Sequence, residues 1–270
     1  MTLLQSFVLG LVQGLTEFIP VSSSGHLVLV PHLLGWHFPK DQSFVFDVLV
    51  QLGTLAAVVV YYWQDLTAIA RAFILSLVRR QPFAEADARM GWFLILATLP
   101  AVVVGLLAKD LVEQAFASPK MTGVFLLCTA VLLLIAEKAG RRCRSMQEID
   151  WKDSLWIGFS QVLALLPGVS RSGATLAGGM TRHLDRPAAA RFSFLMSVPV
   201  MVGAGVLAVK DLFNLPAPHD FLLPLLVGFL TAMVSGYLAI RWLITYLSRH
   251  SLYIFAGYCA AVGLLIVLLL

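Results

Sequence analysis

The chain has 270 residues, of which 59% are hydrophobic and only 13% are charged, and its mean hydropathy is +0.87. Soluble domains carry about 25% charged residues, so the composition excludes an ordinary soluble domain and predicts an integral membrane protein. The net charge of +4 does not indicate nucleic-acid binding, because membrane proteins retain Lys and Arg on their cytoplasmic side.

Several apolar windows have the length of about 18 residues that predicts a membrane-spanning helix. They lie, in chain order, at residues 44–63, 91–108, 121–136, 188–209, 221–240 and 252–270, and the third is short for a span. We therefore expect an all-α integral membrane protein with six transmembrane helices in a single membrane domain, residues 1–270.

Two further apolar segments, at residues 3–21 and 154–167, end in clusters of Pro, Ser and Gly part-way through the length of a span. Non-helical backbone at membrane depth is tolerated only where it is buried in protein or lines a watery cavity. We therefore expect two re-entrant helical hairpins whose breaks mark an internal site.

The two broken segments repeat each other at a constant offset of 148 residues without gaps, and the offset continues into the next predicted span of each half. Apolar bias does not explain the paired polar residues and glycines. These pairs are Gln13 and Gln161, Ser22 and Ser170, Ser24 and Ser172, Gly10 and Gly158, and Gly25 and Gly173. We divide the chain into a first repeat (1–137), a basic cytoplasmic linker (138–153) and a second repeat (154–270).

Most of the 19 Lys and Arg residues fall on one side of the membrane if the N-terminus and the first re-entrant segment start outside. The positive-inside rule prefers this topology. Three spans per half then make the second half inverted relative to the first, and inverted repeats with broken helices place their site near the midplane. Residues 66–81 mix apolar residues with arginines, so they form either a helix along the cytoplasmic surface or a plain connector.

The two copies differ in chemistry at three positions. Glu17 corresponds to Leu165, Ser23 to Arg171, and His26 to Ala174. The repeated scaffold is therefore symmetric, whereas its reactive residues are not.

Glu17 follows Gln13 by four residues, so both side chains lie on one face of a helix. A charge at membrane depth costs roughly 2.5 to 3.5 kcal/mol, which makes a functional role the default interpretation. The structural alternative is an ion pair that only holds Arg171 in place. A carboxylate and a carboxamide oxygen predict a hard cation, Mg²⁺ or Ca²⁺, on Glu17 and Gln13, with waters and substrate phosphates as further ligands.

The stretch PVSSSGH at residues 20–26 combines hydroxyls, backbone N–H groups and an imidazole in one turn. Ser22, Ser24 and Gly25 suit an anion, although helix capping is the ordinary role of such residues. His26 lies three residues after Ser23, near enough for its imidazole to accept the serine proton and activate a nucleophile. His26 as the nucleophile, and a metal-activated water, stay open as alternatives.

The matching stretch PGVSRSG at residues 167–173 presents Arg171, whose guanidinium fork matches phosphate oxygens. The expected diphosphate-binding set also contains Ser170, Ser172, Gly173 and Thr175, at a break that can open the next helix with its N-terminal amides. An arginine, a cation, a nucleophile and a proton acceptor are the components of phosphoryl transfer.

Three motifs in order resemble those of one known family. QGLTE at residues 13–17 resembles its (E/Q)-x-x-x-E element, PVSSSGH its P-V-S-S-[ST]-G-H element, and PGVSRSGAT at residues 167–175 its P-G-x-S-R-S-G-x-T element. The family is the undecaprenyl-diphosphate phosphatases, also called bacitracin resistance proteins. The likeness runs from Gly10 to Pro199 and, in topology, over nearly the whole chain.

This resemblance implies a multi-pass enzyme of the bacterial cytoplasmic (inner) membrane, with its active site reached from the outer, periplasmic side. It implies hydrolysis of undecaprenyl diphosphate to undecaprenyl phosphate and inorganic phosphate, which recycles the lipid carrier of peptidoglycan synthesis and confers bacitracin resistance. It assigns Glu17 and His26 to catalysis, Arg171 to the diphosphate, and Ser23 to the nucleophile or its immediate neighbourhood. Gln13 departs from the family pattern, which often has glutamate there, so the number and strength of metal contacts stay open.

The main alternative from another class is a polyprenyl-phosphate flippase or other transporter, because inverted repeats with broken helices are typical of transporters. The asymmetric set of Glu17, Ser23, His26 and Arg171 favours the enzyme. The expected partners are a polyprenyl diphosphate lipid and the bilayer, with no nucleic acid. The oligomeric state stays open, with a homodimer as one alternative.

Overall fold

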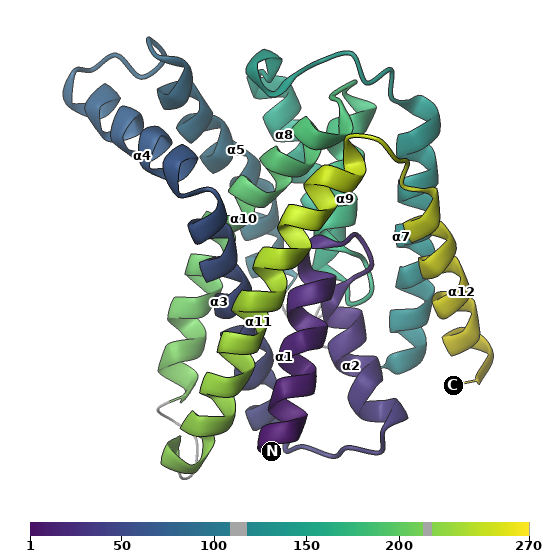
Figure 1. Cartoon of the computed structure of the whole chain (residues 1–270). Helices are drawn as coiled ribbons and strands as arrows, with labels where there is room; N and C mark the ends of the chain where they lie inside the picture. Colours follow the sequence, from purple (N-terminus) through teal and green to yellow (C-terminus); the bar gives the residue numbers. More distant parts are fainter. Residues whose placement is uncertain (109–117, 213–217, 270) are drawn as a thin grey trace.

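The structure is a computed structural model, and it describes residues 1–108, 118–212 and 218–269. Within those ranges the chain forms eleven α-helices and two short 3₁₀-helices and no strand, so the predicted all-α fold is confirmed (Figure 1). The α-helices are α1 (Leu3–Phe18), α2 (Ser23–Leu33), α3 (Lys40–Tyr61), α4 (Trp63–Val78), α5 (Ala86–Leu107), α7 (Pro119–Ala139), α8 (Trp151–Val162), α9 (Arg171–Thr181), α10 (Arg186–Leu212), α11 (Pro218–Leu247) and α12 (Tyr253–Leu269). The 3₁₀-helices are η1 (Met146–Glu148) and η2 (Leu163–Leu165).

Four helices are long and apolar enough to cross a membrane, namely α5, α7, most of α10 and most of α11. They contain four of the six predicted spans. The first predicted span corresponds to α3, which is long and apolar enough to cross a membrane only when it is taken together with α4. The last corresponds to α12, an apolar helix with 17 described residues. By length and composition, the described part of the chain is therefore a multi-pass membrane protein with four or five spans.

The chain bends by 83° between α3 and α4, so that α4 leaves the bundle at a steep angle (Figure 1). The residues at the bend, Tyr61, Tyr62 and Trp63, include neither proline nor glycine, and tertiary contacts hold it instead. Asp65 in the first turn of α4 pairs with Arg191 of α10 at 2.7 Å. Residues 66–78 of the segment 66–81 belong to a separate helix that packs on α5, whereas the position of this segment along a membrane surface stays a prediction.

Both predicted breaks fall where the motifs lie. The helix α1 ends at Phe18 and α2 begins at Ser23, and the two helices pack against each other as a hairpin. The helix α8 ends at Val162, and α9 begins at Arg171 after η2 and a short turn. The turns of the two hairpins therefore carry PVSSSGH and PGVSRSG, as the sequence predicts.

The two halves exchange equivalent packing partners. The helix α1 packs along α11, its counterpart α8 packs along α5, and the pairs α3–α10 and α7–α12 join helices at matching places in the two halves. A Cβ atom on Gly10 would lie 2.5 Å from the carbonyl oxygen of Gly228, and one on Gly158 would lie 2.5 Å from that of Ala97. The paired glycines therefore allow close approach of two helix backbones, as small residues do between helices in membranes.

Two buried carboxylates bind arginines beside the predicted linker. Glu137, near the end of α7, accepts two hydrogen bonds from Arg186 of α10 at 2.7 and 2.6 Å. Asp153, in the first turn of α8, accepts from Arg144 at 2.6 Å and from Arg182 at 2.7 Å. The hydrogen bond with Asp153 raises the pKa of Arg144, so this pair stays ionised. These contacts fix the linker against the ends of α8 and α9.

Candidate active site

The turn between α1 and α2 is closed by Ser22, which caps α2. Its hydroxyl accepts the backbone N–H of Gly25 at 3.3 Å, and its backbone has a φ of 71°, in the left-handed region. Few non-glycine residues adopt that conformation, and those that do concentrate at functional sites. The Ser22 carbonyl accepts both the backbone N–H of His26 at 3.2 Å and its Nδ1 at 2.7 Å.

The turn before α9 is built around Ser170 in a similar way. Its hydroxyl accepts the backbone N–H of Gly173 at 3.0 Å, while its own N–H donates to Thr129 of α7 at 2.9 Å. Thr129 in turn donates to the carbonyl of Gly168, which has a φ of 104°. The turn is therefore anchored to α7 through one hydroxyl.

Glu17, at the end of α1, joins the two turns. Its Oε1 accepts a hydrogen bond from Nη2 of Arg171 at 2.5 Å, and its Oε2 accepts one from Oγ of Ser23 at 2.5 Å. The carboxylate is buried, with 7% of its residue surface exposed. The structure thus brings together three of the four residues that the sequence predicts to be catalytic, from the two halves of the chain.

Gln13 extends this cluster by one helical turn. Its Nε2 donates to Oε2 of Glu17 at 2.8 Å and lies 3.5 Å from the hydroxyl of Thr54 on α3. Thr54 was not among the predicted site residues, because nothing in the sequence distinguishes it within the predicted span at residues 44–63. The predicted pairing of Gln13 and Glu17 on one helix face is confirmed.

Two buried polar atoms of this cluster have no hydrogen-bond partner among the described residues. They are Nη1 of Arg171 and Oε1 of Gln13. Leaving a buried polar group unpaired costs about 1 to 3 kcal/mol, so each is a position where a ligand atom would be stabilised. A guanidinium N–H attracts an anion, whereas a carboxamide oxygen attracts a cation or a hydrogen-bond donor.

The cluster meets the requirements of a hydrated cation site in part. The described residues contain no group of three or more His, Cys, Asp or Glu side chains that could hold a metal. The unpaired Oε1 of Gln13 is a hard oxygen ligand, and it lies in the same side-chain cluster as the carboxylate of Glu17. These two residues fit Mg²⁺ or Ca²⁺ only as a cation whose other ligands are waters and phosphate oxygens.

The sequence predicts a contact between His26 and Ser23, but in the structure both ring nitrogens of His26 contact other groups. Its Nδ1 is bound to the Ser22 carbonyl, and its Nε2 lies 2.7 Å from the hydroxyl of Tyr258 on α12. The proton acceptor that touches Ser23 is Glu17, six residues earlier in the chain. Tyr258 was missed because it lies in a predicted span in which nothing distinguishes it from an interfacial aromatic residue.

The remaining residues of the expected diphosphate-binding set serve first as turn and helix-capping residues. The hydroxyls of Ser22 and Ser24 are 3.3 Å apart, and those of Ser170 and Ser172 are 3.1 Å apart. Thr175 bonds the hydroxyl of Ser193 on α10 at 2.5 Å and the carbonyl of Arg171 at 2.7 Å. Gly25 and Gly173 donate the backbone N–H of each cap. Within the set, Arg171 alone has an unpaired buried side-chain atom.

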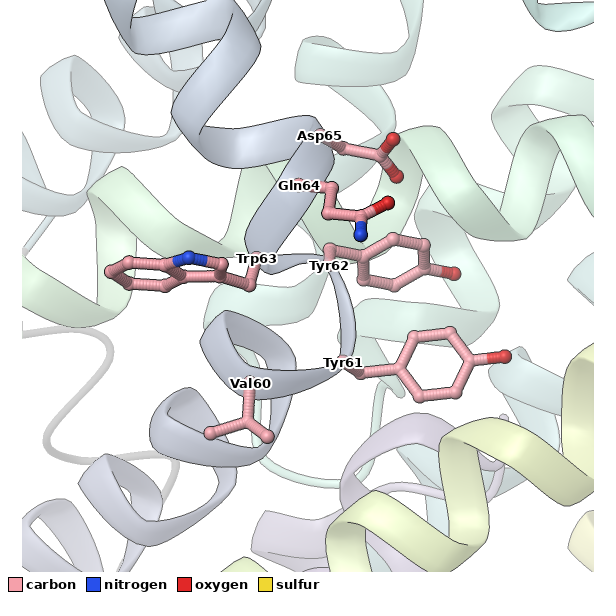
Figure 2. A pocket seen from close by; sticks show the side chains of 6 residues that line it. All are labelled: Val60, Tyr61, Tyr62, Trp63, Gln64 and Asp65. Atoms are coloured by element: carbon pink, nitrogen blue, oxygen red, sulfur yellow. The ribbon is translucent and has the colours of Figure 1, made fainter.

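A pocket of about 390 Å³ lies elsewhere, at the bend between α3 and α4. Figure 2 shows Tyr61, Tyr62, Gln64 and Asp65 pointing to one side of the chain and Trp63 to the other. None of its lining residues belongs to the Glu17 cluster, by which we mean the hydrogen-bonded side chains of Gln13, Glu17, Ser23, Thr54 and Arg171. Tyr and Trp side chains, which form much of this pocket, are typical of residues at a membrane interface. We therefore assign the chemistry to the Glu17 cluster and not to this pocket.

Comparison with known proteins agrees with the resemblance found in the motifs. A profile of the family described as "Bacitracin resistance protein BacA" matches residues 6–265. The undecaprenyl-diphosphatase of Myxococcus xanthus (strain DK1622) is 42% identical over 270 residues, which cover 100% of this chain and 90% of that protein. The undecaprenyl-diphosphatase of Desulforudis audaxviator (strain MP104C) is 43% identical over 265 residues, which cover 98% of this chain and 97% of that protein.

Proposed function

Because the chain belongs to the bacitracin resistance protein BacA family, we propose that it is a membrane phosphatase that hydrolyses undecaprenyl diphosphate to undecaprenyl phosphate and inorganic phosphate. This activity recycles the lipid carrier of peptidoglycan synthesis, and by regenerating the carrier it confers resistance to bacitracin. The observation that carries the proposal is the buried carboxylate of Glu17, which holds a serine hydroxyl with one oxygen and an arginine with the other.

In the first step, Ser23 is the nucleophile and Glu17 is its base. The Oγ of Ser23 forms a bond to the terminal phosphorus, its proton passes to Oε2 of Glu17, and the bond from that phosphorus to the bridging oxygen breaks. Undecaprenyl phosphate leaves with the electron pair of the broken bond. Arg171 stabilises the charge on the transferring phosphoryl oxygens, and its Nη1 supports this role because it is a buried donor with no partner in the described part of the chain.

In the second step, water cleaves the phosphoserine. The water oxygen bonds to phosphorus, the bond between phosphorus and Oγ of Ser23 breaks, and the proton held by Glu17 returns to the serine. His26 is the base that we propose for this water, because its position on α2 brings it within one turn of Ser23 and Glu17 then already carries a proton. His26 as the nucleophile is the competing hypothesis.

A divalent cation, Mg²⁺ or Ca²⁺, is part of the proposal. Gln13 and Glu17 would hold it, and when bound it would neutralise charge on the diphosphate. The unpaired Oε1 of Gln13 supports this assignment. The shortage of carboxylates around it indicates that the cation would share its ligands with substrate and water.

We also propose that the two halves are inverted repeats with six transmembrane helices and two re-entrant hairpins. The exchange of packing partners, with α1 on α11 and α8 on α5, supports this arrangement. The lipid tail would lie in the bilayer of the bacterial inner membrane, and the diphosphate would reach Arg171 from the outer side. A homodimer is a separate hypothesis, which a mass measurement in detergent tests.

The deciding experiment measures phosphate release from undecaprenyl diphosphate, and from the shorter farnesyl diphosphate, by the purified full chain with added Mg²⁺ or Ca²⁺. We expect activity in the wild type and a loss of at least about a hundredfold in Ser23→Ala and Arg171→Ala. The Thr16→Val variant should keep the wild-type activity. Thr16 is the matched control because it neighbours Glu17 and, among the residues that the structure describes, its hydroxyl donates only to the Val12 carbonyl of its own helix. A wild type that releases no phosphate but moves polyprenyl phosphate between leaflets would refute the enzyme and favour the flippase.

The nucleophile is identified by quenching a reaction during turnover. A phosphoserine survives acid and is lost in alkali, whereas a phosphohistidine behaves in the opposite way. Mass spectrometry of the acid-quenched protein should place a phosphoryl group on Ser23. A group that is lost in acid and maps to His26 would overturn the assignment of the nucleophile while leaving the phosphatase intact.

A further inference from the structure

The C-terminal helix α12 reaches the first broken turn through two consecutive residues. The hydroxyl of Tyr258 lies 2.7 Å from Nε2 of His26, and the two rings are nearly parallel, with an interplanar angle of 11°. The next residue, Cys259, places its sulfur 3.6 Å from the carbonyl of Pro20. The turn that carries Ser23 is therefore supported by a helix from the opposite end of the chain.

The hydrogen bonds of His26 determine where its proton lies. A carbonyl oxygen carries no hydrogen, so the 2.7 Å contact between Nδ1 and the Ser22 carbonyl requires a proton on Nδ1. In the neutral imidazole, Nε2 is then an acceptor, and the hydroxyl of Tyr258 is its donor. Since Nδ1 is committed to the backbone, Nε2 is the only nitrogen that can exchange a proton with water during the reaction.

Burial alone does not explain the contact. Tyr258 has 43% of its surface exposed, so its hydroxyl is not forced to find a protein partner. His26 is buried, and the conformation of Ser22 that presents its carbonyl is uncommon for serine. In the second copy, the position of His26 is Ala174, so no equivalent contact exists there.

We propose that Tyr258 takes part in the phosphatase reaction through His26. Its hydroxyl holds the imidazole oriented with Nε2 unprotonated, and when water attacks the phosphoserine, the Tyr258 oxygen accepts the water proton while its own proton passes to Nε2. This inference rests on the proposed function. It adds α12, which lies outside all three motifs, to the active site.

The test is a double-mutant cycle on the full chain, with kcat and KM measured for undecaprenyl diphosphate. Tyr258→Phe removes only the hydroxyl and should lower kcat by about tenfold, while KM stays within about twofold. In the His26→Ala background, Tyr258→Phe should have no further effect on kcat, because its partner is already gone. The matched control is Tyr253→Phe, since Tyr253 lies on the same helix, is about equally exposed and has no side-chain hydrogen bond among the described residues.

Three kinetic outcomes overturn the proposal while the wild type remains a phosphatase. They are a folded Tyr258→Phe variant with wild-type kcat, a loss that appears in KM alone, and effects of Tyr258→Phe and His26→Ala that multiply.

A spectroscopic measurement covers the cases in which the variant fails to fold or the wild type lacks phosphatase activity. Nitrogen NMR of histidine-labelled wild-type protein, assigned by comparison with His26→Gln, should show a neutral His26 protonated on Nδ1. A His26 protonated on Nε2 would overturn the proposal, whatever the activity.

Discussion

Replacing Glu17 by glutamine tests the centre of the site, because it keeps the shape of the side chain and removes its charge. The carboxylate accepts from Arg171 on one oxygen, and from Ser23 and Gln13 on the other. An amide offers only one acceptor oxygen. If that oxygen faces Arg171, the new NH₂ group faces Ser23 and Gln13 and can take no proton from the serine.

The size of the expected effect on the rate follows from the proposed role of Glu17 as the general base. Loss of a positioned general base typically costs about 10²- to 10⁴-fold in rate, or about 3 to 5 kcal/mol of transition-state stabilisation. Removal of one partner from a buried ion pair costs a similar 3 to 5 kcal/mol, but in stability. We therefore expect Glu17→Gln to lower kcat/KM by at least about a hundredfold and also to lower the unfolding temperature.

The assay has to separate these two effects. Phosphate release is normalised to the folded fraction, measured by size-exclusion chromatography and thermal unfolding in the same detergent, with Thr16→Val as the control. If folded Glu17→Gln retains more than about a tenth of the wild-type kcat/KM, Glu17 is not the base. Its role would then be the structural alternative, an ion pair that holds Arg171.

Three further predictions test other parts of the molecule. Gln13→Glu adds a second carboxylate beside Glu17, so the Mg²⁺ or Ca²⁺ concentration for half-maximal activity should fall by about tenfold in a cation titration; an unchanged titration would remove the cation from Gln13. Glu137→Gln should lower the free energy of unfolding, measured by thermal unfolding, by about 3 to 5 kcal/mol, because its arginine partners lose a buried carboxylate. The folded fraction of this variant should keep the wild-type kcat. Gly158→Ala should lower the free energy of unfolding by about 1 to 3 kcal/mol because its Cβ would meet the Ala97 carbonyl. Gly203→Ala, whose Cβ would meet no described atom within 4 Å, should be neutral in the same measurement.

The sequence was sufficient to predict the features that depend on local chemistry. The broken helices, their Ser caps and the pairing of Gln13 with Glu17 all follow from spacing along one segment. Four of the spans follow from hydropathy because their apolar windows are long. The span count was less predictable, since the chain turns by 83° after α3 at residues without proline or glycine.

The partners of the reactive residues were less predictable because they depend on packing between distant segments. Ser23 and His26 are close in the chain, so spacing favoured a pair between them. In the structure, Ser23 donates to Glu17, and His26 contacts Tyr258, 232 residues away. Neither preference is visible in a local pattern, since both depend on how α1 and α12 pack around the turn.

The repeat explains why the Glu17 cluster forms where it does. Ser23 is the first residue of α2 and Arg171 is the first residue of α9, so they hold equivalent positions in the two copies. Both reach the same carboxylate, one on each oxygen, and the position equivalent to Glu17 in the second copy is Leu165. The two repeated turns thus bring two helix N-termini together, and the single carboxylate of Glu17 binds the first side chain of each helix. If the serine and the arginine act on one phosphoryl group, each must come from a different copy, so neither half would be active alone.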